Sequence, residues 1–167
     1  MKRSRWAAAG GLLVLLCVAG LVAMSGPGAS AAPRNQSSAT GTVADWGPHR
    51  CLTATGTTPY SWAVFASCTG NSQQRWVVHV VGGQVQILLK GANWLGRDMC
   101  LGIAGNTAVM LVCGTQGTHL NTARAYGSWR VITIAGRRLT DTGRGSQAGW
   151  WETRRWQNQR ILLPDGI

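Results

Sequence analysis

Carboxylates are scarce after the first 31 residues, and their positions limit the reactions that this chain could catalyse. The five are Asp45, Asp98, Asp141, Glu152 and Asp165. Glycoside hydrolysis usually needs a pair of them across one bond, and only Asp141 and Glu152 fall in the same part of the chain. The histidines (His49, His79 and His119) lie apart without metal-ligand spacing, and no nucleophile or phosphate-loop motif occurs. The sequence therefore predicts no catalytic residue, no metal and no cofactor.

Cysteine is the residue type with the clearest chemistry. Four cysteines follow residue 31: Cys51, Cys68, Cys100 and Cys113. An even number in an exported chain indicates two disulfides, whereas a zinc site would need closer spacing. Sequence alone leaves three pairings open. The repeat described below puts each neighbouring pair in one unit, which favours Cys51–Cys68 and Cys100–Cys113.

Residues 1–31 have the pattern of an export signal. A basic start precedes an apolar run over residues 7–24, and small residues occupy 29–31. We expect cleavage before Ala32, which leaves a secreted chain of 136 of the 167 residues. Retention of the signal as a membrane anchor is the less favoured alternative, since about 20 apolar residues can cross a bilayer.

The rest of the chain is strongly basic. Loss of three basic residues with the signal leaves 13 Lys and Arg against 5 Asp and Glu, a net charge of +8. Such a charge favours anionic partners, including cell-surface polymers. No helical period or aromatic-basic motif of a nucleic-acid reader is present, so we expect no nucleic acid as partner. We predict a disordered polar linker over 32–41, then one monomeric domain over 42–167.

Short apolar runs between Gly, Asn, Asp and Thr predict an all-β domain. The expected strands are Trp62–Cys68, Arg75–Val81, Gln84–Leu89, Ala108–Cys113, Ser128–Ile134 and Arg160–Leu163. The pairs Gly82-Gly83 and Ala135-Gly136 are typical of hairpin turns. Many short strands with regular turns indicate a barrel or a sandwich.

The strands belong to an internal repeat. Its copies begin at Cys51-Leu52, Cys100-Leu101 and Arg138-Leu139, and each continues into a similar strand: AVFASC, AVMLVC or AGWWET. The first copy ends in Gln74-x-Trp76 and the third in Gln159-x-Ile161, whereas the second runs irregularly to Trp129. A unit of this length cannot cover its own apolar face, so three copies must pack together.

This ordered set of residues resembles the ricin-type β-trefoil lectin domain, over about residues 42–164. The resemblance implies a β-trefoil with three repeats and two disulfides within repeats, and it implies that Trp76, Trp129 and Ile161 belong to the core. It also implies carbohydrate binding, by an Asp after Cys-Leu, an aromatic two residues before the second Cys, and an Asn or Gln near the repeat ending.

All three repeats lack an acid at the family's acid position, which is Thr140 in the third, and the first two lack the aromatic as well. In the first repeat the acid and aromatic positions are Thr53 and Ala66, although Gln73 is present and Phe65 is one position away. In the second they are Gly102 and Leu111. We expect neither of these repeats to bind sugar.

The third repeat keeps more of the pattern, so the resemblance implies one binding site for a glycan or polysaccharide. Its residues are Thr140, Asp141, Trp151, Asn158 and Gln159. Three of them have a structural alternative. Trp151 could be a core or edge aromatic, although Trp150 and Trp151 must point to opposite faces if they lie in one strand. Asp141 could form a turn, and Gln159 could bind neighbouring backbone.

Two function classes remain open at this stage. The first is a secreted, non-catalytic, lectin-like module that binds through its third repeat. The second is a scaffold that has lost sugar binding and acts as a protein-interaction module, an inhibitor or a cationic cell-envelope adhesin. A different small disulfide-linked β-fold is a third possibility, which a Cys51–Cys113 bond would support.

Overall fold

The computed structural model describes residues 36–47, 49–81, 84–126, 128–143, 147–152 and 157–165. All of them belong to one compact unit, Ala32–Ile167. The expected signal and the Gly82-Gly83 turn lie outside the described residues. Within these residues the only helices are the short 3-10 turns η1 (Ser72–Gln74) and η2 (Gln157–Gln159), so the all-β prediction is confirmed. Neither turn is long or apolar enough to cross a membrane.

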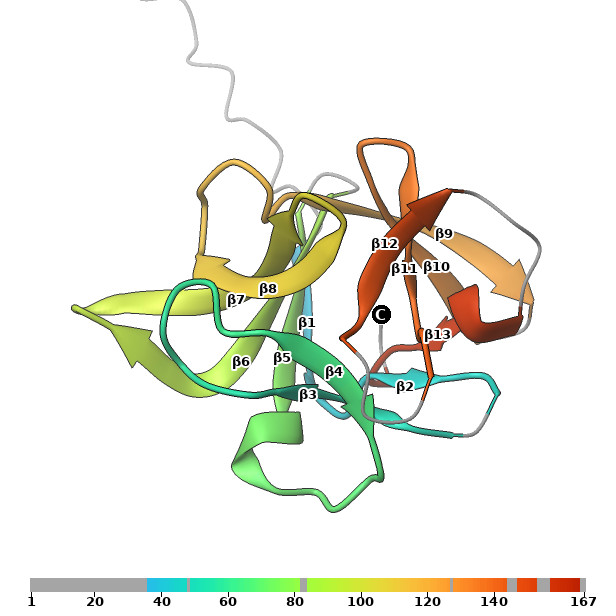
Figure 1. The fold of residues 1–167 in the computed structure, drawn as a ribbon, viewed down its shortest axis with the longest axis horizontal. Helices are drawn as coiled ribbons and strands as arrows, with labels where there is room; N and C mark the ends of the chain where they lie inside the picture. The colour runs from blue at the N-terminus through green and yellow to red at the C-terminus, as the bar shows by residue number, and fades with distance from the viewer. Residues whose placement is uncertain are drawn as a thin grey trace, which may run out of the picture. The chain divides into compact units, whose positions relative to one another are not determined.

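Three four-stranded repeats make up the domain (Figure 1). The first contains β2 (Ala44–Asp45), β3 (Cys51–Ala54), β4 (Ala63–Ala66) and β5 (Trp76–Val81). The second contains β6 (Gln84–Trp94), β7 (Arg97–Ala104), β8 (Thr107–Val112) and β9 (Leu120–Tyr126). The third contains β10 (Trp129–Ile134), β11 (Arg137–Thr140), β12 (Gly149–Glu152) and β13 (Ile161–Leu162).

The central hairpins of the repeats share one register. Leu52 lies opposite Phe65, Leu101 opposite Met110, and Leu139 opposite Trp150. The three pairs occupy the same place in each repeat, which confirms the alignment made from the sequence. Residues at matching positions of different repeats can therefore be compared directly.

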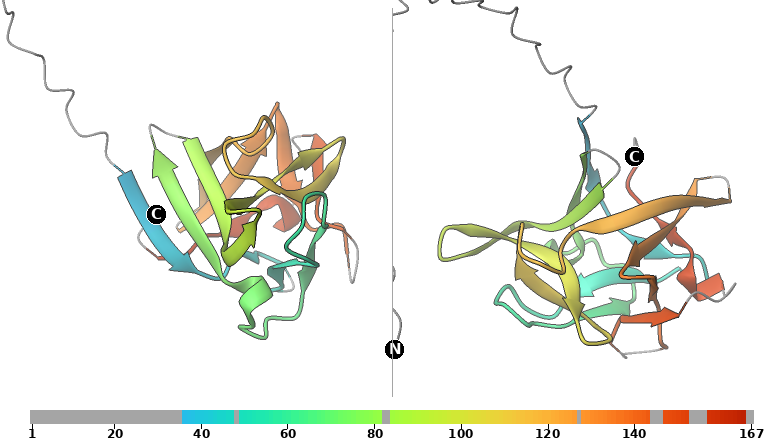
Figure 2. Two further views of the ribbon diagram at one scale, coloured as in Figure 1. Left: turned by 90° about the vertical axis from the view of Figure 1, so that its left-hand side faces the viewer. Right: turned by 90° about the horizontal axis from the view of Figure 1, so that it is seen from above.

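The first and last strands of the repeats form the barrel wall. The neighbours are β5 with β6, β6 with β9, β9 with β10, β10 with β13 and β13 with β2. Strand β1 (Gln36–Gly41) pairs with β5 at six positions and continues towards β2, so residues 36–45 close the wall between β5 and β13 (Figure 2).

Strand β1 corrects the predicted linker over 32–41. Residues 36–41 are small and polar, yet they form a strand, because backbone groups make the ladder hydrogen bonds and an edge strand can do without large apolar side chains. Only residues 32–35 of that segment remain outside the described residues.

Three alanines bring the central hairpins together over one end of the barrel. The Ala108 amide donates to the Ala148 carbonyl at 2.9 Å, and the Ala148 amide donates to the Ala63 carbonyl at 2.8 Å. All three side chains are fully buried. Because their side chains are single methyl groups, three backbones can meet at the centre of the cap.

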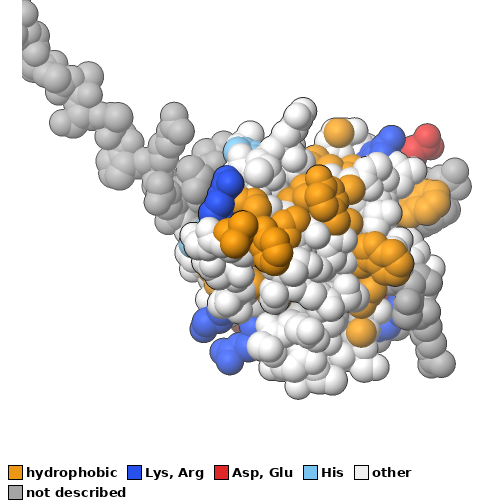
Figure 3. Space-filling model, turned by 60° about the vertical axis from the view of Figure 1, so that its left-hand side comes forward, with side chains coloured by type: hydrophobic (Ala, Val, Ile, Leu, Met, Phe, Trp, Pro, Cys, Tyr) orange, Lys and Arg blue, Asp and Glu red, His pale blue; other side chains and the backbone are white. Residues whose placement is uncertain are grey.

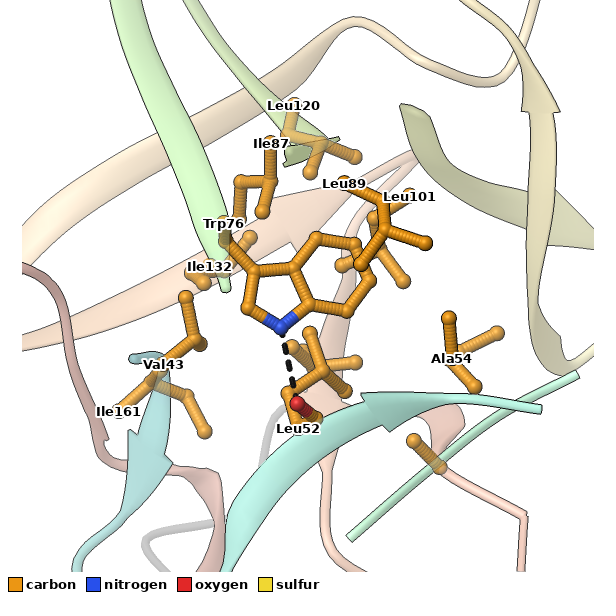
Figure 4. Close-up of a cluster of buried hydrophobic side chains, with 14 of the residues drawn as sticks. Val43, Leu52, Ala54, Trp76, Ile87, Leu89, Leu101, Leu120, Ile132 and Ile161 are labelled. Atoms are coloured by element: carbon orange, nitrogen blue, oxygen red, sulfur yellow. Dashed lines mark hydrogen bonds between the residues drawn. The ribbon is translucent and has the colours of Figure 1, made fainter. Parts of the chain in front are cut away.

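The core repeats three times as well. Trp76, Leu120 and Ile161 begin the fourth strands and are fully buried. The indole Nε1–H of Trp76 donates to the Leu52 carbonyl at 2.8 Å (Figure 4). The core positions predicted for Trp76 and Ile161 are therefore confirmed.

The core position predicted for Trp129 is wrong. Trp129 is half-buried and packs edge-on against Trp46, with ring centroids 4.7 Å apart. Leu120 takes the core position instead, seven residues after Cys113, whereas Trp76 follows Cys68 by eight. Thr118 replaces the usual Gln, and its hydroxyl accepts the Gly114 amide at 3.2 Å. One deleted residue and two substitutions hid this ending in the sequence.

Other predictions on the fold agree with the structure. The six predicted strands exist, although the one predicted over Gln84–Leu89 extends to Trp94 as β6. Ala135 and Gly136 form the predicted turn, with φ of 47° and 75°. The disulfides are Cys51–Cys68 and Cys100–Cys113, each within one repeat, as predicted.

Candidate functional site

A pocket of about 570 Å³ lies on the third repeat, beside the β11–β12 hairpin. Four of the five predicted site residues line it: Thr140, Asp141, Trp151 and Asn158. The other lining residues are Asn106, Arg137, Thr142, Trp150 and Glu152. Asn106 comes from the β7–β8 turn of the second repeat, so two repeats build this pocket.

The adjacent tryptophans of β12 point to opposite faces, as an extended strand requires. Trp150 is fully buried and its Nε1–H donates to the Gly102 carbonyl at 3.1 Å. Trp151 is 49% exposed and presents its ring to the pocket. The alternation expected from the sequence is confirmed, and Trp151 is available to a ligand.

Gly149 gives Trp151 its position. A Cβ added to Gly149 would lie 2.5 Å from the Trp151 Nε1, so the indole lies directly across the glycine backbone. The matching residues of the other repeats are Val64 and Val109, which have branched side chains at the position where the third repeat has none. The Gly-x-Trp spacing is a sequence signal for this platform that the motif comparison did not use.

Asp141 is held by an arginine from the first repeat. The Arg50 Nε donates to Asp141 Oδ2 at 2.8 Å, and its Nη2 forms an ion pair with Oδ1. The Gly143 amide also donates to Oδ1, at 2.9 Å. Arg50 and Asp141 are 91 positions apart, and nothing in the sequence pattern indicates that they meet.

Asn158 is joined to the same residue through the backbone. Its Nδ2 donates to the Asp141 carbonyl at 2.8 Å, and its own carbonyl accepts the Asp141 amide at 3.1 Å. Its Oδ1 has no hydrogen-bond donor among the described residues. This oxygen is buried, so Asn158 fixes the edge of the pocket beside Asp141 and does not expose an acceptor on its surface.

Gln159 lies behind the pocket rather than in its lining. It is fully buried, and its Nε2 donates to Thr140 Oγ1 at 3.2 Å and to the Glu152 carbonyl at 3.0 Å. Gln74 does the same in the first repeat, with Thr53 Oγ1 at 2.9 Å and a backbone carbonyl at 2.8 Å. Gln159 therefore fixes the threonine and the repeat ending, which was the structural alternative for this residue.

A second buried carboxylate, Asp45, stands behind Asp141. Its Oδ1 accepts the Arg50 amide at 2.6 Å, and no described residue donates to its Oδ2. Burial, together with the neighbouring Asp141 carboxyl group, raises the pKa of Asp45 from 3.8 to about 6, against a lowering effect of Arg50. Two carboxylates thus share one arginine, a cluster that the sequence did not reveal.

The second repeat has a pocket at the matching place, but with different chemistry. It measures about 440 Å³, and Ile103, Ala104, Leu111 and Val112 line it where the third repeat has Asp141, Thr142, Trp151 and Glu152. The remaining lining residues are Pro59, Tyr60, Thr115 and Gln116. The hairpin side of this pocket is apolar, and no carboxylate of the described residues lines it, so it does not repeat the arrangement of Asp141 beside Trp151.

The first repeat has also lost the pattern. Phe65, one position from the aromatic site, is fully buried in the core, and Ala66 occupies the site itself. Thr53 is engaged by Gln74. Among the described residues, no three His, Cys, Asp or Glu side chains gather as metal ligands.

Similar solved structures establish the fold. A designed three-fold symmetric protein, ThreeFoil, superposes with a TM-score of 0.65 at 13% identity, over 75% of this chain and 98% of that one. The Rhizoctonia solani agglutinin gives 0.61 at 14% identity, over 77% and 96%. The chain is a β-trefoil. No protein-family model and no curated protein matches it in sequence.

Other neighbours share this β-trefoil as one part of a larger protein. The Clostridium thermocellum exo-β-1,3-galactanase gives a TM-score of 0.62 at 16% identity, over 75% of this chain and 30% of the enzyme. At such identities the likeness concerns the fold alone. The trefoil thus occurs in an agglutinin and in an enzyme, so the function of this chain must be argued from its own residues.

Proposed function

We propose that the protein is a secreted, non-catalytic module that binds carbohydrate through the third-repeat pocket. The observation that carries the proposal is the position of Trp151. Its side chain is half-exposed, lies against the backbone of Gly149, and lines a pocket that Asp141 and Asn158 also line. An aromatic ring covers the C–H face of a sugar, and fixed polar groups select its hydroxyls. The two disulfides fit an oxidising compartment outside the cell.

The polar groups of the pocket have separate tasks in this proposal. Asp141 accepts ligand hydroxyls with lone pairs that Arg50 and Gly143 leave unused, and Asn158 holds Asp141 in place through the hydrogen bond from its Nδ2 to the Asp141 carbonyl. Thr140 and Gln159 hold the Asp141 side of the pocket in place. The Thr140 hydroxyl and the Gln159 Nε2 are bonded within the protein, so we assign them no contact with the ligand. Asp45 is fully buried, so the Asp45–Asp141 pair does not offer two accessible carboxylates for hydrolysis.

A glycan panel with a matched tryptophan control tests the proposal. Trp151→Ala should abolish binding to the glycans that the protein recognises. Trp62→Ala removes another exposed tryptophan. Trp62 directly precedes β4 and is 54% exposed, and its loss should leave glycan binding unchanged. Equal binding by the wild-type protein and Trp151→Ala would reject the site.

The second candidate is a trefoil that binds anionic cell-envelope polymers or a protein partner without a sugar site. The net charge of +8 after residue 31 favours an anionic polymer, and the apolar side chains that β7 and β8 contribute to the second-repeat pocket favour a protein partner. Raised salt separates the two, because charge-driven adhesion is screened whereas stacking and hydroxyl hydrogen bonds persist. Binding that disappears in high salt and ignores Trp151→Ala would support this candidate.

A further inference from the structure

The β6–β7 hairpin is longer than its counterpart in the third repeat. Strands β6 and β7 have 11 and 8 residues, whereas β10 and β11 have 6 and 4. Residues 93–98 are all exposed, so the end of the hairpin stands beyond the core. Figure 1 shows it projecting outwards, and Figure 2 shows the same in its right-hand view.

The tip of this hairpin carries apolar side chains that the fold does not need. Leu95 is 84% exposed and Trp94 is 37% exposed. Leu95 also has a φ of 51° and is followed by Gly96 at 79°, a turn that favours Asn, Asp or Gly at its first position. The matching turn uses Ala135-Gly136 with nearly the same angles. Leucine at this position therefore carries both the cost of an exposed apolar side chain and the cost of a left-handed backbone conformation.

One basic residue lies at the tip, and two others lie further along the hairpin and beside it. Arg97 lies directly opposite Trp94, and Lys90 lies on the same hairpin arm, with its amide bonded to the carbonyl of Arg75. Arg75, Lys90 and Arg97 are exposed, and Asp98 is the single acid among residues 93–98. Figure 3 shows hydrophobic side chains gathered over the middle of one face and Lys or Arg side chains near its margin.

We propose that this hairpin tip docks the protein on an anionic lipid bilayer. A convex tip with Leu and Trp suits insertion at the interface, where Trp is favoured and leucine gains from the acyl region. The basic residues at and near it suit an anionic headgroup layer. A protein partner would instead need a complementary concave surface. The docking is independent of the third-repeat pocket and therefore of the proposed carbohydrate function.

A strain-relieving variant separates docking from folding. Leu95→Asn removes the apolar contact, and asparagine tolerates a positive φ, so thermal stability should stay equal or rise. Its binding to vesicles of phosphatidylcholine and phosphatidylglycerol in equal parts should fall about tenfold, as expected for the loss of one buried leucine. Arg97→Gln should weaken binding to these vesicles but not to pure phosphatidylcholine. Trp62→Ser should bind like the wild-type protein.

Hydrogen exchange localises the contact in the full chain. All variants contain the same apolar residues 7–24. Any vesicle binding by that segment is therefore equal in every variant and cancels in the comparison. Vesicles should protect the amides of residues 90–98 in the wild-type protein and not in Leu95→Asn. Three outcomes would overturn the proposal: unchanged vesicle binding by Leu95→Asn, equal protection by soluble dextran sulfate, or wild-type self-association that Leu95→Asn abolishes, which would make a second copy the partner.

Discussion

The pockets of the second and third repeats lie at the same place on the same scaffold but receive different side chains from their hairpins. Their hairpins have identical registers, yet Ile103 and Leu111 stand in one where Asp141 and Trp151 stand in the other. The second repeat is held by a disulfide, whereas side-chain hydrogen bonds around Asp141, Asn158 and Gln159 tie the third together. The fold therefore fixes where a pocket lies, and a few side chains decide what it can bind.

The largest expected effect comes from the two adjacent tryptophans of β12. Trp150→Ala should lower the free energy of unfolding by about 3 to 5 kcal/mol, because it opens a cavity in the core and leaves the Gly102 carbonyl without its donor. Trp151→Ala should change it by less than about 0.5 kcal/mol. Urea denaturation measures both, and similar losses would contradict the division between core and pocket.

The second effect concerns the cross-link of the second repeat. Cys100→Ala combined with Cys113→Ala should cost about 3 kcal/mol, the amount expected for a loop closed over 13 residues. Ligand binding by the third repeat should persist below the lowered melting temperature. Loss of binding in protein that is still folded would show that the two repeats are not independent.

The third effect is a pH dependence that belongs to the third-repeat site. The pKa of Asp45 is raised from 3.8 to about 6 in the folded protein, so the native state binds the extra proton between these values. Stability should therefore fall as pH rises from about 4 to about 6, and this contribution stays lost above that. Asp45→Asn mimics the protonated acid, so it should flatten the change and raise stability at pH 7, by at most about 3 kcal/mol.

The measurement for this third effect is thermal unfolding at pH 5 and pH 7.5. Asp98→Asn serves as the control, because Asp98 is exposed on the β6–β7 hairpin and should leave the profile unchanged. A wild-type protein that is equally stable at both pH values would show that Asp45 titrates normally.

The smallest effect tests how finely the Trp151 platform is placed. Gly149→Ala puts a methyl group where the indole now lies, so the ring must move while the strand remains. We expect glycan affinity to fall a few-fold with little change in stability. Titration calorimetry measures the affinity, and an unchanged value would show that the ring position is not critical.

Local pattern predicted much of this molecule. The recurring leucine and the cysteine spacing gave the three repeats, their register and the disulfides, and strand alternation gave the opposite faces of Trp150 and Trp151. The ending of the second repeat was missed because Thr118 and Leu120 replace the Gln and the Trp of the Gln-x-Trp motif. The cluster of Asp45, Arg50 and Asp141 was missed because it forms only when the first repeat packs against the third. A single sequence has no local signal for that contact.

The seam between β2 and β13 joins the beginning of the domain to its end. It consists of two residue pairs, Asp45 with Ile161 and Ala44 with Leu162, and the Arg50–Asp141 ion pair reinforces it. Contacts so distant in sequence are slow to form. During synthesis or export, the third-repeat pocket therefore cannot be completed until β13 has emerged, and a chain truncated before Asn158 would lack both the seam and the Asn158 side of the pocket.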